Sequence, residues 1–451
     1  MNVINNIFKA YDVRGKVGSE LTPEVAGAIG KAFADWLPTD GVVAVGRDMR
    51  PDSAELADAL IDGLRTQGRT VWDIGEVTSD MIYFAIGKFN LAGGAVVTAS
   101  HNPGAYNGIK IYRDQVTPVG LDSGLDKIRD AALSGTFKPA AATPGTIEQH
   151  DITNDWIDHA LSFVQPDSWP KYRIAIDAGN GMAGAILPGV LKRLPLEVEE
   201  MYFDLDGSFP NHEANPQKPE NLRDLVKVVT DKGYDFGIAF DGDGDRAALV
   251  DDKGRPVLGT DMLTLVARHY LTENPGAEVV HEVRTSRATQ EFIREWGGTP
   301  VRTKAGRINI GRVLREHHAP FGGETTGHLF FAKNFDADSG LIAALMAIQA
   351  LSEAGGKKLS ELVDEYRRYP MLTETNFEVT DTAAVFERLR GTYKDQQQDE
   401  LDGLTVQFDD GAWFNLRASN TEPVVRLNAE APTQEALDKL VATVTKLITN
   451  E

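Results

Sequence analysis

The stretch FGIAFDGDGDR, residues 236–246, joins a short apolar run to a loop in which aspartate and glycine alternate. An apolar run of this length that is bounded by turn residues is typical of a buried strand. The stretch therefore predicts a strand over residues 235–240, followed directly by the carboxylates of Asp241, Asp243 and Asp245. Open α/β sheets bind ligands beyond the carboxyl ends of their strands, so we expect this loop to line a site.

Similar apolar runs alternate with segments of helical period along most of the chain, which favours an α/β fold with mixed sheets. The runs form three blocks, and in each block one strand leads into a polar or glycine-rich loop. The expected strands are 41–45, 70–74 and 94–98 in the first block, 172–177, 197–203 and 235–240 in the second, and 277–283, 299–303 and 321–323 in the third. The expected helices are 53–65, 261–271 and 340–354.

The composition changes after Tyr366, and the remaining chain has the pattern and the length of a small α+β domain. Strands are expected there over 373–379, 405–408, 412–416 and 424–429, and helices over 382–389 and 434–448. We therefore predict three related α/β domains and one C-terminal α+β domain. Their expected bounds are 1–145, 146–252, 253–366 and 367–451.

Lys and Arg number 46, and Asp and Glu number 67, in this chain of 451 residues, which gives a net charge of −21. An acidic chain repels nucleic acid and anionic membranes, so neither is expected as a partner. The absence of cysteine excludes disulfides, thiolate metal sites and cysteine nucleophiles. Because the chain shows no long apolar run and no signal-peptide pattern, we expect a cytoplasmic enzyme. Both a monomer and a dimer stay open.

The acidic loop favours a metal site. Alternate carboxylates separated by glycine can direct three oxygens at one hard cation, and without a cation they would repel one another. An EF-hand is excluded because its sixth and twelfth positions would be Arg246 and Asp252 rather than Gly and Glu. A phosphatase of the haloacid-dehalogenase type would use Asp241 as its nucleophile, but Asp245 stands where that type normally has Thr or Val.

The loop TASHNP, residues 98–103, follows the third strand of the first block. Ser100 would be exposed on the turn and could act as a nucleophile or as a phosphate carrier. Because Ser100 and His101 are neighbours in sequence, we do not expect them to form a nucleophile–base pair directly. Lys110 could transfer a proton if nearby cations lower its pKa. Taken alone, the loop also fits an Asx-rich turn.

Two further loops carry polar groups suited to a sugar phosphate. The loop GGETTGH, residues 322–328, offers a carboxylate, hydroxyls and an imidazole that can pair with sugar hydroxyls. The loop RASNTEP, residues 417–423, offers an arginine and backbone N–H groups that can bind phosphate. Each loop alone also fits an ordinary polar turn.

Together and in this order, the four loops resemble those of the α-D-phosphohexomutase family and are closest to its phosphomannomutase/phosphoglucomutase members. The resemblance extends from FKAYDVRG, residues 8–15, to the loop 417–423, and so covers nearly the whole chain. It implies four domains around a central cleft, and an isomerase of carbohydrate metabolism that interconverts hexose 1-phosphate and hexose 6-phosphate. Ser100 would be phosphorylated in the resting enzyme, and a hexose 1,6-bisphosphate would be the intermediate.

The resemblance also implies roles for individual residues. Mg²⁺ would be bound by the three loop aspartates and by a phosphoryl oxygen on Ser100. Arg246 would help to bind the transferring phosphoryl group. Lys110 and His101 would handle the proton of the reacting hydroxyl, and His328 is a weaker candidate. The substrate-binding residues would be Tyr11, Arg14, Arg284, Arg307, Glu324, Thr326, His328, Arg417, Ser419, Asn420, Thr421 and Arg426.

Three positions depart from the family's pattern. The sugar loop usually has Ser where this chain has Thr326, so a hydroxyl is kept. Lys is expected at the position of Arg284, and in mannose-handling members His is expected near Arg307. The preference among mannose, glucose and glucosamine phosphates therefore stays open, with phosphoglucosamine mutase as the alternative within the family. A metal-dependent phosphosugar phosphatase and a non-catalytic phosphosugar-binding protein are alternatives from other classes.

Overall fold

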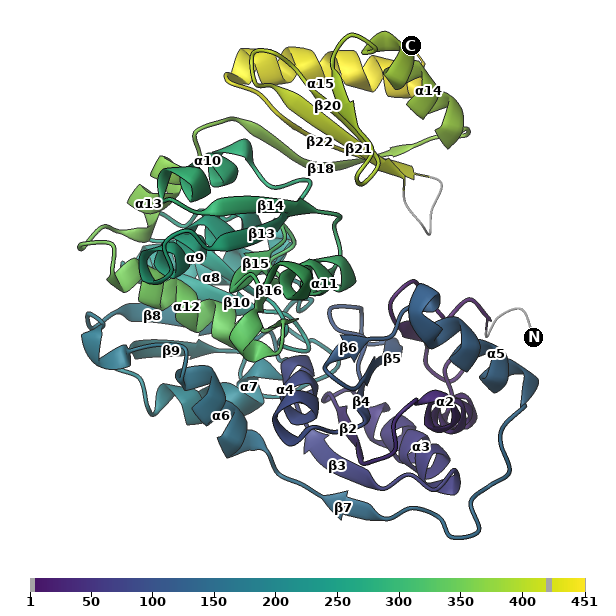
Figure 1. Ribbon diagram of the computed structural model, residues 1–451. Helices are drawn as coiled ribbons and strands as arrows, with labels where there is room; N and C mark the ends of the chain where they lie inside the picture. Colours follow the sequence, from purple (N-terminus) through teal and green to yellow (C-terminus); the bar gives the residue numbers. More distant parts are fainter. Residues whose placement is uncertain (1–4, 419–423, 451) are drawn as a thin grey trace. The chain divides into compact units, whose positions relative to one another are not determined.

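The computed structural model describes residues 5–418 and 424–450 (Figure 1). The chain forms two compact units. The first unit runs to Val257 and also contains His328–Leu359, and the second unit contains Leu258–Gly327 and continues from Ser360. Among the described residues, no helix is both long enough and apolar enough to cross a membrane.

The first unit begins with a mixed sheet in the order β1-β5-β4-β2-β3-β7, with β6 paired to β5. Strands β2, β3, β4 and β7 are parallel, whereas β5 is antiparallel to both β4 and β1. The strands are β1 (Val13–Lys16), β2 (Val43–Arg47), β3 (Val71–Glu76), β4 (Gly93–Val97), β5 (Tyr106–Arg113), β6 (Thr117–Pro118) and β7 (Ile147–Gln149). The helices are α2 (Pro23–Trp36), α3 (Ser53–Thr66), α4 (Ser79–Phe89) and α5 (Asp126–Ser134).

Helices α2 and α3 lie side by side against this sheet (Figure 1). Helix α2 begins where Thr22 accepts a hydrogen bond from the backbone N–H of Val25 at 3.4 Å, with Pro23 in the first turn. Phe33 of α2, Leu60 of α3 and the strand residue Val45 are buried in one apolar core. The face of the sheet that carries Val45 is therefore covered by α2 and α3.

The second sheet of the first unit has the order β12-β11-β10-β8-β9. Strand β10 is parallel to β8 and antiparallel to β11, and all five of its residues are buried. The strands are β8 (Arg173–Asp177), β9 (Glu197–Met201), β10 (Phe236–Phe240), β11 (Ala247–Asp251) and β12 (Pro256–Val257). The helices are α6 (Thr153–Leu161), α7 (Ala183–Leu191), α8 (Arg223–Lys232) and α12 (Gly340–Ser352). The first unit also contains the antiparallel pair β16 (Leu329–Phe331) and β17 (Ala337–Asp338).

The second unit begins with three parallel strands in the order β14-β13-β15. These strands are β13 (Glu278–Glu282), β14 (Thr299–Thr303) and β15 (Phe321–Gly323). The helices are α9 (Gly259–Glu273), α10 (Arg287–Glu295), α11 (Arg307–His317) and α13 (Leu359–Tyr366), the last of which belongs to this unit from Ser360 onward.

The chain ends in an antiparallel sheet of the order β18-β22-β21-β20-β19. Figure 1 shows α14 and α15 on one face of this sheet. The strands are β18 (Met371–Glu378), β19 (Gln397–Asp399), β20 (Leu404–Gln407), β21 (Trp413–Ala418) and β22 (Val424–Glu430), and the helices are α14 (Thr382–Thr392) and α15 (Gln434–Thr449).

These elements confirm the fold class predicted from the sequence, namely three α/β parts, of which the first two have mixed sheets, and an α+β tail. Every strand that the apolar runs predicted is present, with bounds that differ by a few residues. The sequence analysis did not predict β5, β11, α2 or α4.

Candidate functional site

The acidic loop is the connection between β10 and β11, at the carboxyl end of the buried strand β10. Asp241, Asp243 and Asp245 are buried there, and one carboxylate oxygen from each lies within 4.8 Å of the others. The tight backbone depends on Gly244, which has a φ of +75° and would place a Cβ 2.7 Å from Cγ2 of Thr78. The loop therefore brings three buried carboxylates to one point.

Two cations face these carboxylates. Lys110 Nζ, on β5, donates to Asp243 Oδ2 at 2.5 Å and to Asp245 Oδ2 at 2.7 Å. Arg246 donates to Asp241 Oδ2 through Nε at 3.0 Å and through Nη2 at 2.8 Å. Burial raises the pKa of Asp241 to about 7, although Arg246 opposes the rise. Burial also acts to raise the pKa of Asp243. The charge of Lys110 and the hydrogen bonds from Lys110 and Ser79 outweigh burial, so the pKa of Asp243 lies below its usual value.

The donor set of the cluster fits a hard metal ion. The cluster contains three carboxylates but only two cationic side chains, Lys110 and Arg246. One negative charge is therefore left over, and a bound cation can balance it. Asp243 Oδ1 is buried and accepts no hydrogen bond from the described residues. A buried carboxylate oxygen of this kind is costly unless it finds a partner, and oxygen donors suit hard divalent cations.

Ser100 lies on the loop between β4 and β5, and it is buried, not exposed as the sequence predicted, because the acidic loop packs against it. Its Oγ donates to Asp241 Oδ2 at 3.1 Å and lies 3.2 Å from His101 Nδ1. Ser100 Oγ therefore lies beside His101, but its proton is directed to Asp241 and not to the imidazole. The φ of Ser100 is +52°, and this left-handed backbone breaks the alternation that would turn the two side chains apart.

His101 is held as an acceptor. Arg246 Nη2 donates to His101 Nδ1 at 2.5 Å, which leaves Nδ1 without a proton. Burial and the guanidinium of Arg246 lower the pKa of His101 to about 3. The imidazole is therefore neutral near pH 7, and its Nδ1 is already bound by Arg246.

Arg14, on β1, supports the serine loop from another side. Its Nη1 donates to Asn102 Oδ1 at 2.8 Å, and its Nη2 donates to Asp12 Oδ2 at 2.6 Å. Tyr11, which is 40% exposed, stands next to Asp12 in sequence. The structure thus places a cation next to the predicted phosphoserine loop, together with an exposed aromatic residue nearby in the chain.

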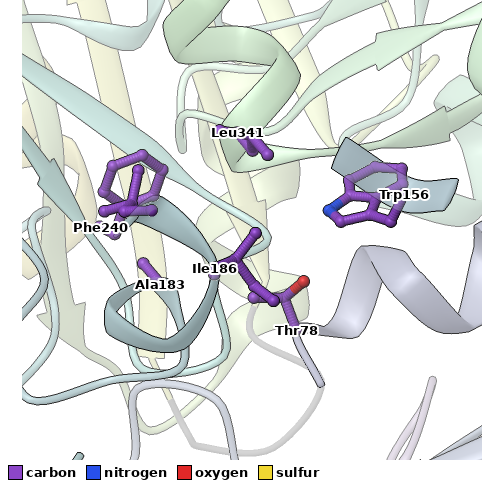
Figure 2. A pocket seen from close by; sticks show the side chains of 8 residues that line it. Thr78, Trp156, Ala183, Ile186, Phe240 and Leu341 are labelled. Carbon is purple, nitrogen blue, oxygen red and sulfur yellow. The ribbon is translucent and has the colours of Figure 1, made fainter. Parts of the chain in front are cut away.

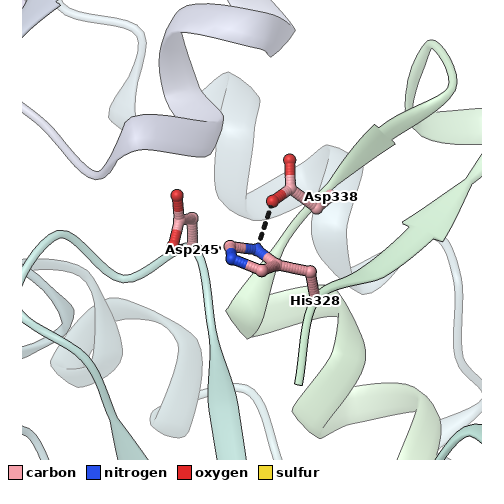
Figure 3. Close-up of side chains that lie close together, drawn as sticks. All are labelled: Asp245, His328 and Asp338. Carbon is pink, nitrogen blue, oxygen red and sulfur yellow. Dashed lines mark hydrogen bonds and ion pairs between the residues drawn. The ribbon is translucent and has the colours of Figure 1, made fainter. Parts of the chain in front are cut away.

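His328 is the residue directly before β16, and its side chain lies next to Asp245 of the acidic cluster (Figure 3). The ring atom Nδ1 shares a 2.6 Å hydrogen bond with Asp338 Oδ2 and lies 4.0 Å from Asp245 Oδ1. Ser100, His101, Lys110, Arg246, His328 and the three aspartates are therefore grouped within the first unit.

Gly244 also borders a small cavity in the first unit (Figure 2). The cavity is lined by Thr78, Trp156, Ala183, Ile186, Leu187, Phe240, Gly244 and Leu341. Because this lining offers few polar groups, it suits apolar packing next to the acidic loop and does not suit a sugar phosphate.

The second unit holds most of the predicted sugar-binding and phosphate-binding residues. Glu324 is buried and accepts a hydrogen bond of 3.1 Å from the backbone N–H of Gly306. Arg284 is also buried, and its Nη2 lies 3.9 Å from Glu324 Oε2. Arg307 begins α11, and Thr326 follows β15 on the loop of Glu324.

Arg417 on β21 and Arg426 on β22 are paired in register across the tail sheet. Both donate to the carboxylate of Glu374 on β18, Arg417 at 2.7 Å and Arg426 at 3.3 Å, and Arg284 donates to Glu374 at 3.0 Å. Burial acts to raise the pKa of Glu374, but the three arginines outweigh it and hold that pKa below its usual value. The predicted residues Ser419, Asn420 and Thr421 lie outside the described residues.

The sequence analysis missed several residues that contact this machinery, and three of them show why. Ser79 Oγ donates to Asp243 Oδ2 at 2.5 Å, Asp338 binds His328, and Glu374 binds the arginines. Ser79 stands in a Thr-Ser-Asp pattern that is typical of a helix start, so it carried no separate signal. Asp338 and Glu374 gain their partners only through the tertiary fold.

The sequence matches four domain families along almost its whole length. They are described as phosphoglucomutase/phosphomannomutase, alpha/beta/alpha domain I at residues 5–138, domain II at 154–254, domain III at 259–369, and the C-terminal domain at 374–447.

Among curated proteins, one from Xanthomonas campestris pv. campestris named "Phosphohexose mutases" is 40% identical over 95% of this chain and 96% of its own. A "Phosphomannomutase" from Salmonella montevideo is 38% identical over 97% of this chain and 98% of its own. The crystal structure of a phosphoglucomutase/phosphomannomutase family protein from Burkholderia thailandensis is 32% identical, with a TM-score of 0.90 over 99% of this chain and 98% of its own. Fold, acidic loop and similarity along the full length thus agree, and the chain belongs to the phosphoglucomutase/phosphomannomutase family.

Proposed function

We propose that this protein interconverts hexose 1-phosphate and hexose 6-phosphate, with mannose or glucose as the sugar, through a phosphoserine at Ser100 and a hexose 1,6-bisphosphate. The hydrogen bond of 3.1 Å between Ser100 Oγ and Asp241 Oδ2 is the main support for this proposal. It joins a hydroxyl on one loop to a cluster of carboxylates that fits a hard cation. Membership in the family supports the same activity.

Asp241, Asp243 and Asp245 would hold the metal ion, which we propose to be Mg²⁺. When bound there, the ion would offset the negative charge that builds up on the transferring phosphoryl group. Lys110 now bridges two of these carboxylates, so it is positioned to share them with a metal ion or to turn toward the phosphoryl group. Arg246 is held beside Asp241 and would bind a phosphoryl oxygen.

In the forward transfer, a sugar hydroxyl attacks the phosphorus of phosphoserine, and the bond between phosphorus and Ser100 Oγ breaks. The hydroxyl loses its proton, and the serine oxygen gains one. We assign the proton transfer to Lys110, which would have to leave Asp243 and Asp245 before it could accept a proton, with His328 as the second candidate because Asp338 fixes its ring. His101 does not share this role, although the resemblance implied it, because its pKa is about 3 and its Nδ1 is bound by Arg246.

The second transfer would return the other phosphate to Ser100 after the bisphosphate has turned over. Glu324 and Thr326 would bind sugar hydroxyls common to both orientations of the sugar. Arg417 and Arg426, together with the loop at Ser419, Asn420 and Thr421, would bind the phosphate that does not react. Tyr11 and Arg14 would line the site next to the serine loop, and Arg284 and Arg307 would contribute to sugar preference.

Coupled assays on mannose 1-phosphate, glucose 1-phosphate and glucosamine 1-phosphate test this function and its substrate together. We expect turnover of the first two with Mg²⁺ and a catalytic amount of glucose 1,6-bisphosphate. The matched variant is Ser100→Ala, which should remain folded and lose nearly all turnover. Release of inorganic phosphate without formation of hexose 6-phosphate would instead favour a phosphatase. Binding of sugar phosphate without either product would favour a binding protein.

A further inference from the structure

The guanidinium of Arg50 binds the backbone of the serine loop. Its Nη2 donates to the carbonyl oxygens of Ser100 at 2.9 Å and of Asn102 at 2.6 Å. Its Nη1 donates to the carbonyl oxygens of Pro103 at 3.0 Å and of Tyr106 at 2.9 Å. One side chain thus holds the loop at Ser100 and again where β5 begins.

Asp48 fixes the guanidinium in this position. Asp48 Oδ2 accepts from Arg50 Nε at 3.1 Å, so all five N–H donors of the Arg50 side chain are in use. Asp48 Oδ1 accepts from the backbone N–H of Arg50 at 3.1 Å and from Ser53 Oγ at 2.5 Å. Ser53 Oγ in turn accepts from Asn107 Nδ2 at 2.9 Å. Arg50 is 3% exposed and Asp48 1%, so the pair is shielded from water.

The loop that Arg50 holds carries backbone strain at Ser100. A residue other than glycine with a φ of +52° is in an unfavourable conformation, which persists only where the surroundings enforce it. The acidic loop approaches the same carbonyl group, because a Cβ on Gly242 would lie 2.5 Å from the carbonyl oxygen of Ser100. Arg50 and Gly242 therefore act on the same peptide group, the one that follows the reactive serine.

We propose that Arg50, oriented by Asp48, is the positioning residue that keeps Ser100 in the left-handed conformation from which its Oγ reaches Asp241 and His101. This inference rests on the proposed function of Ser100. Without the carbonyl contacts, the loop would relax toward an ordinary backbone conformation and carry Oγ away from Asp241. Lys cannot replace Arg here, because an ammonium has three donors and no planar fork.

The test compares Arg50→Lys with a matched control, Arg69→Lys. Arg69 also donates to several carbonyl oxygens, those of Ala34 in α2 and of Leu37 and Thr39 just after it, in a part of the first unit that carries no proposed catalytic group. For Arg50→Lys we expect kcat to fall by about 100-fold, with little change in KM for glucose 1-phosphate, because the serine is misplaced while the sugar-binding groups are intact. For Arg69→Lys we expect a lower melting temperature and an unchanged kcat.

A kcat equal to that of the wild type in folded Arg50→Lys would overturn the proposal. Equal losses of kcat in both variants would also overturn it, since they would reflect general destabilisation. If Arg50→Lys does not fold, Asp48→Asn provides the same comparison, and we expect its kcat to fall by about tenfold. Ser100→Ala, assayed in parallel, separates the two hypotheses. An active Ser100→Ala would refute the proposed function itself, whereas an inactive Ser100→Ala beside a fully active Arg50→Lys would refute only the role of Arg50.

Discussion

Arg417 Nη2 donates a hydrogen bond of 2.7 Å to Glu374 Oε2. Arg417 is the arginine that we assign to the phosphate that does not react, so a carboxylate of the protein already occupies part of its binding capacity. Arg426 and Arg284 donate to the same carboxylate. A substrate phosphate must therefore compete with Glu374 or share these arginines with it.

Replacing Glu374 with Gln should strengthen binding of the substrate. The variant keeps the shape of the side chain and removes the charge that competes with phosphate, so we expect KM for glucose 1-phosphate to fall by about two- to fivefold. Steady-state kinetics measure this effect. Glu378→Gln, at the carboxyl end of β18, is the control for loss of one negative charge on the same strand. A higher KM in Glu374→Gln would show that Glu374 organises the arginines for phosphate and does not compete with it.

Asp243→Asn should weaken metal binding. The change removes one negative charge from a cluster in which Asp243 Oδ1 accepts no hydrogen bond from the described residues. We expect the Mg²⁺ concentration for half-maximal activity to rise by roughly tenfold or more, together with a fall in kcat. Metal titrations of enzyme treated with EDTA measure both quantities. The control is Asp235→Asn, which removes a charge directly before β10, at the end of the strand opposite the acidic loop. This variant should leave the metal requirement unchanged. Full activity of the wild type in EDTA would contradict the assignment of a metal site.

Asp338→Asn tests the pairing of Asp338 with His328. A carboxylate that accepts the Nδ1 proton of an imidazole fixes both its tautomer and its orientation. We expect kcat to fall by about tenfold or more, with KM for the sugar phosphate unchanged. A loss of kcat of the same size in His328→Gln and in the double variant would show that the two residues act as one unit. Independent, additive losses would contradict this interpretation.

His281 on β13 should make the stability of the protein sensitive to acid. Burial lowers the pKa of this imidazole from 6.5 to about 4. Between these values the unfolded chain binds a proton at His281 and the folded chain does not. The free energy of unfolding should therefore fall as pH decreases from 6.5 to 4, by about 3 kcal/mol from this residue. Urea unfolding of the wild type and of His281→Asn across this pH range measures the effect. An identical pH dependence in the two proteins would exclude this contribution.

The strands that the sequence predicted are those whose side chains form continuous apolar runs, such as β10. The loops after β4 and β10 were also predictable, because a chemically distinctive motif directly follows a buried strand. Strand β5 was missed because both of its faces are buried and each carries a polar residue, Asn107 on one and Lys110 on the other, which interrupts the apolar pattern. Lys110 can be buried only because Asp243 and Asp245, far away in sequence, pair with its ammonium group. A single sequence gives no sign of such a pairing.

The same limit applies to Arg50 and Glu374. Residues 46–51 read as a charged turn, and nothing local shows that Arg50 folds back onto the carbonyl oxygens of a loop fifty residues away. Glu374 lies on a strand that was predicted, but its three arginine partners come from separate elements. Motifs thus predicted the groups proposed to react, whereas the groups that position them become visible only in the fold.

The central claim is that Ser100 carries the phosphoryl group, and mass spectrometry of the intact protein followed by peptide mapping tests it most directly. After incubation with glucose 1,6-bisphosphate and Mg²⁺, we expect one added phosphoryl group, located on Ser100 and stable to acid, and its transfer to added glucose 1-phosphate. No such group should appear on Ser100→Ala. A phosphoryl group on Asp241, or full mutase turnover by an enzyme that never carries phosphate on Ser100, would contradict the account.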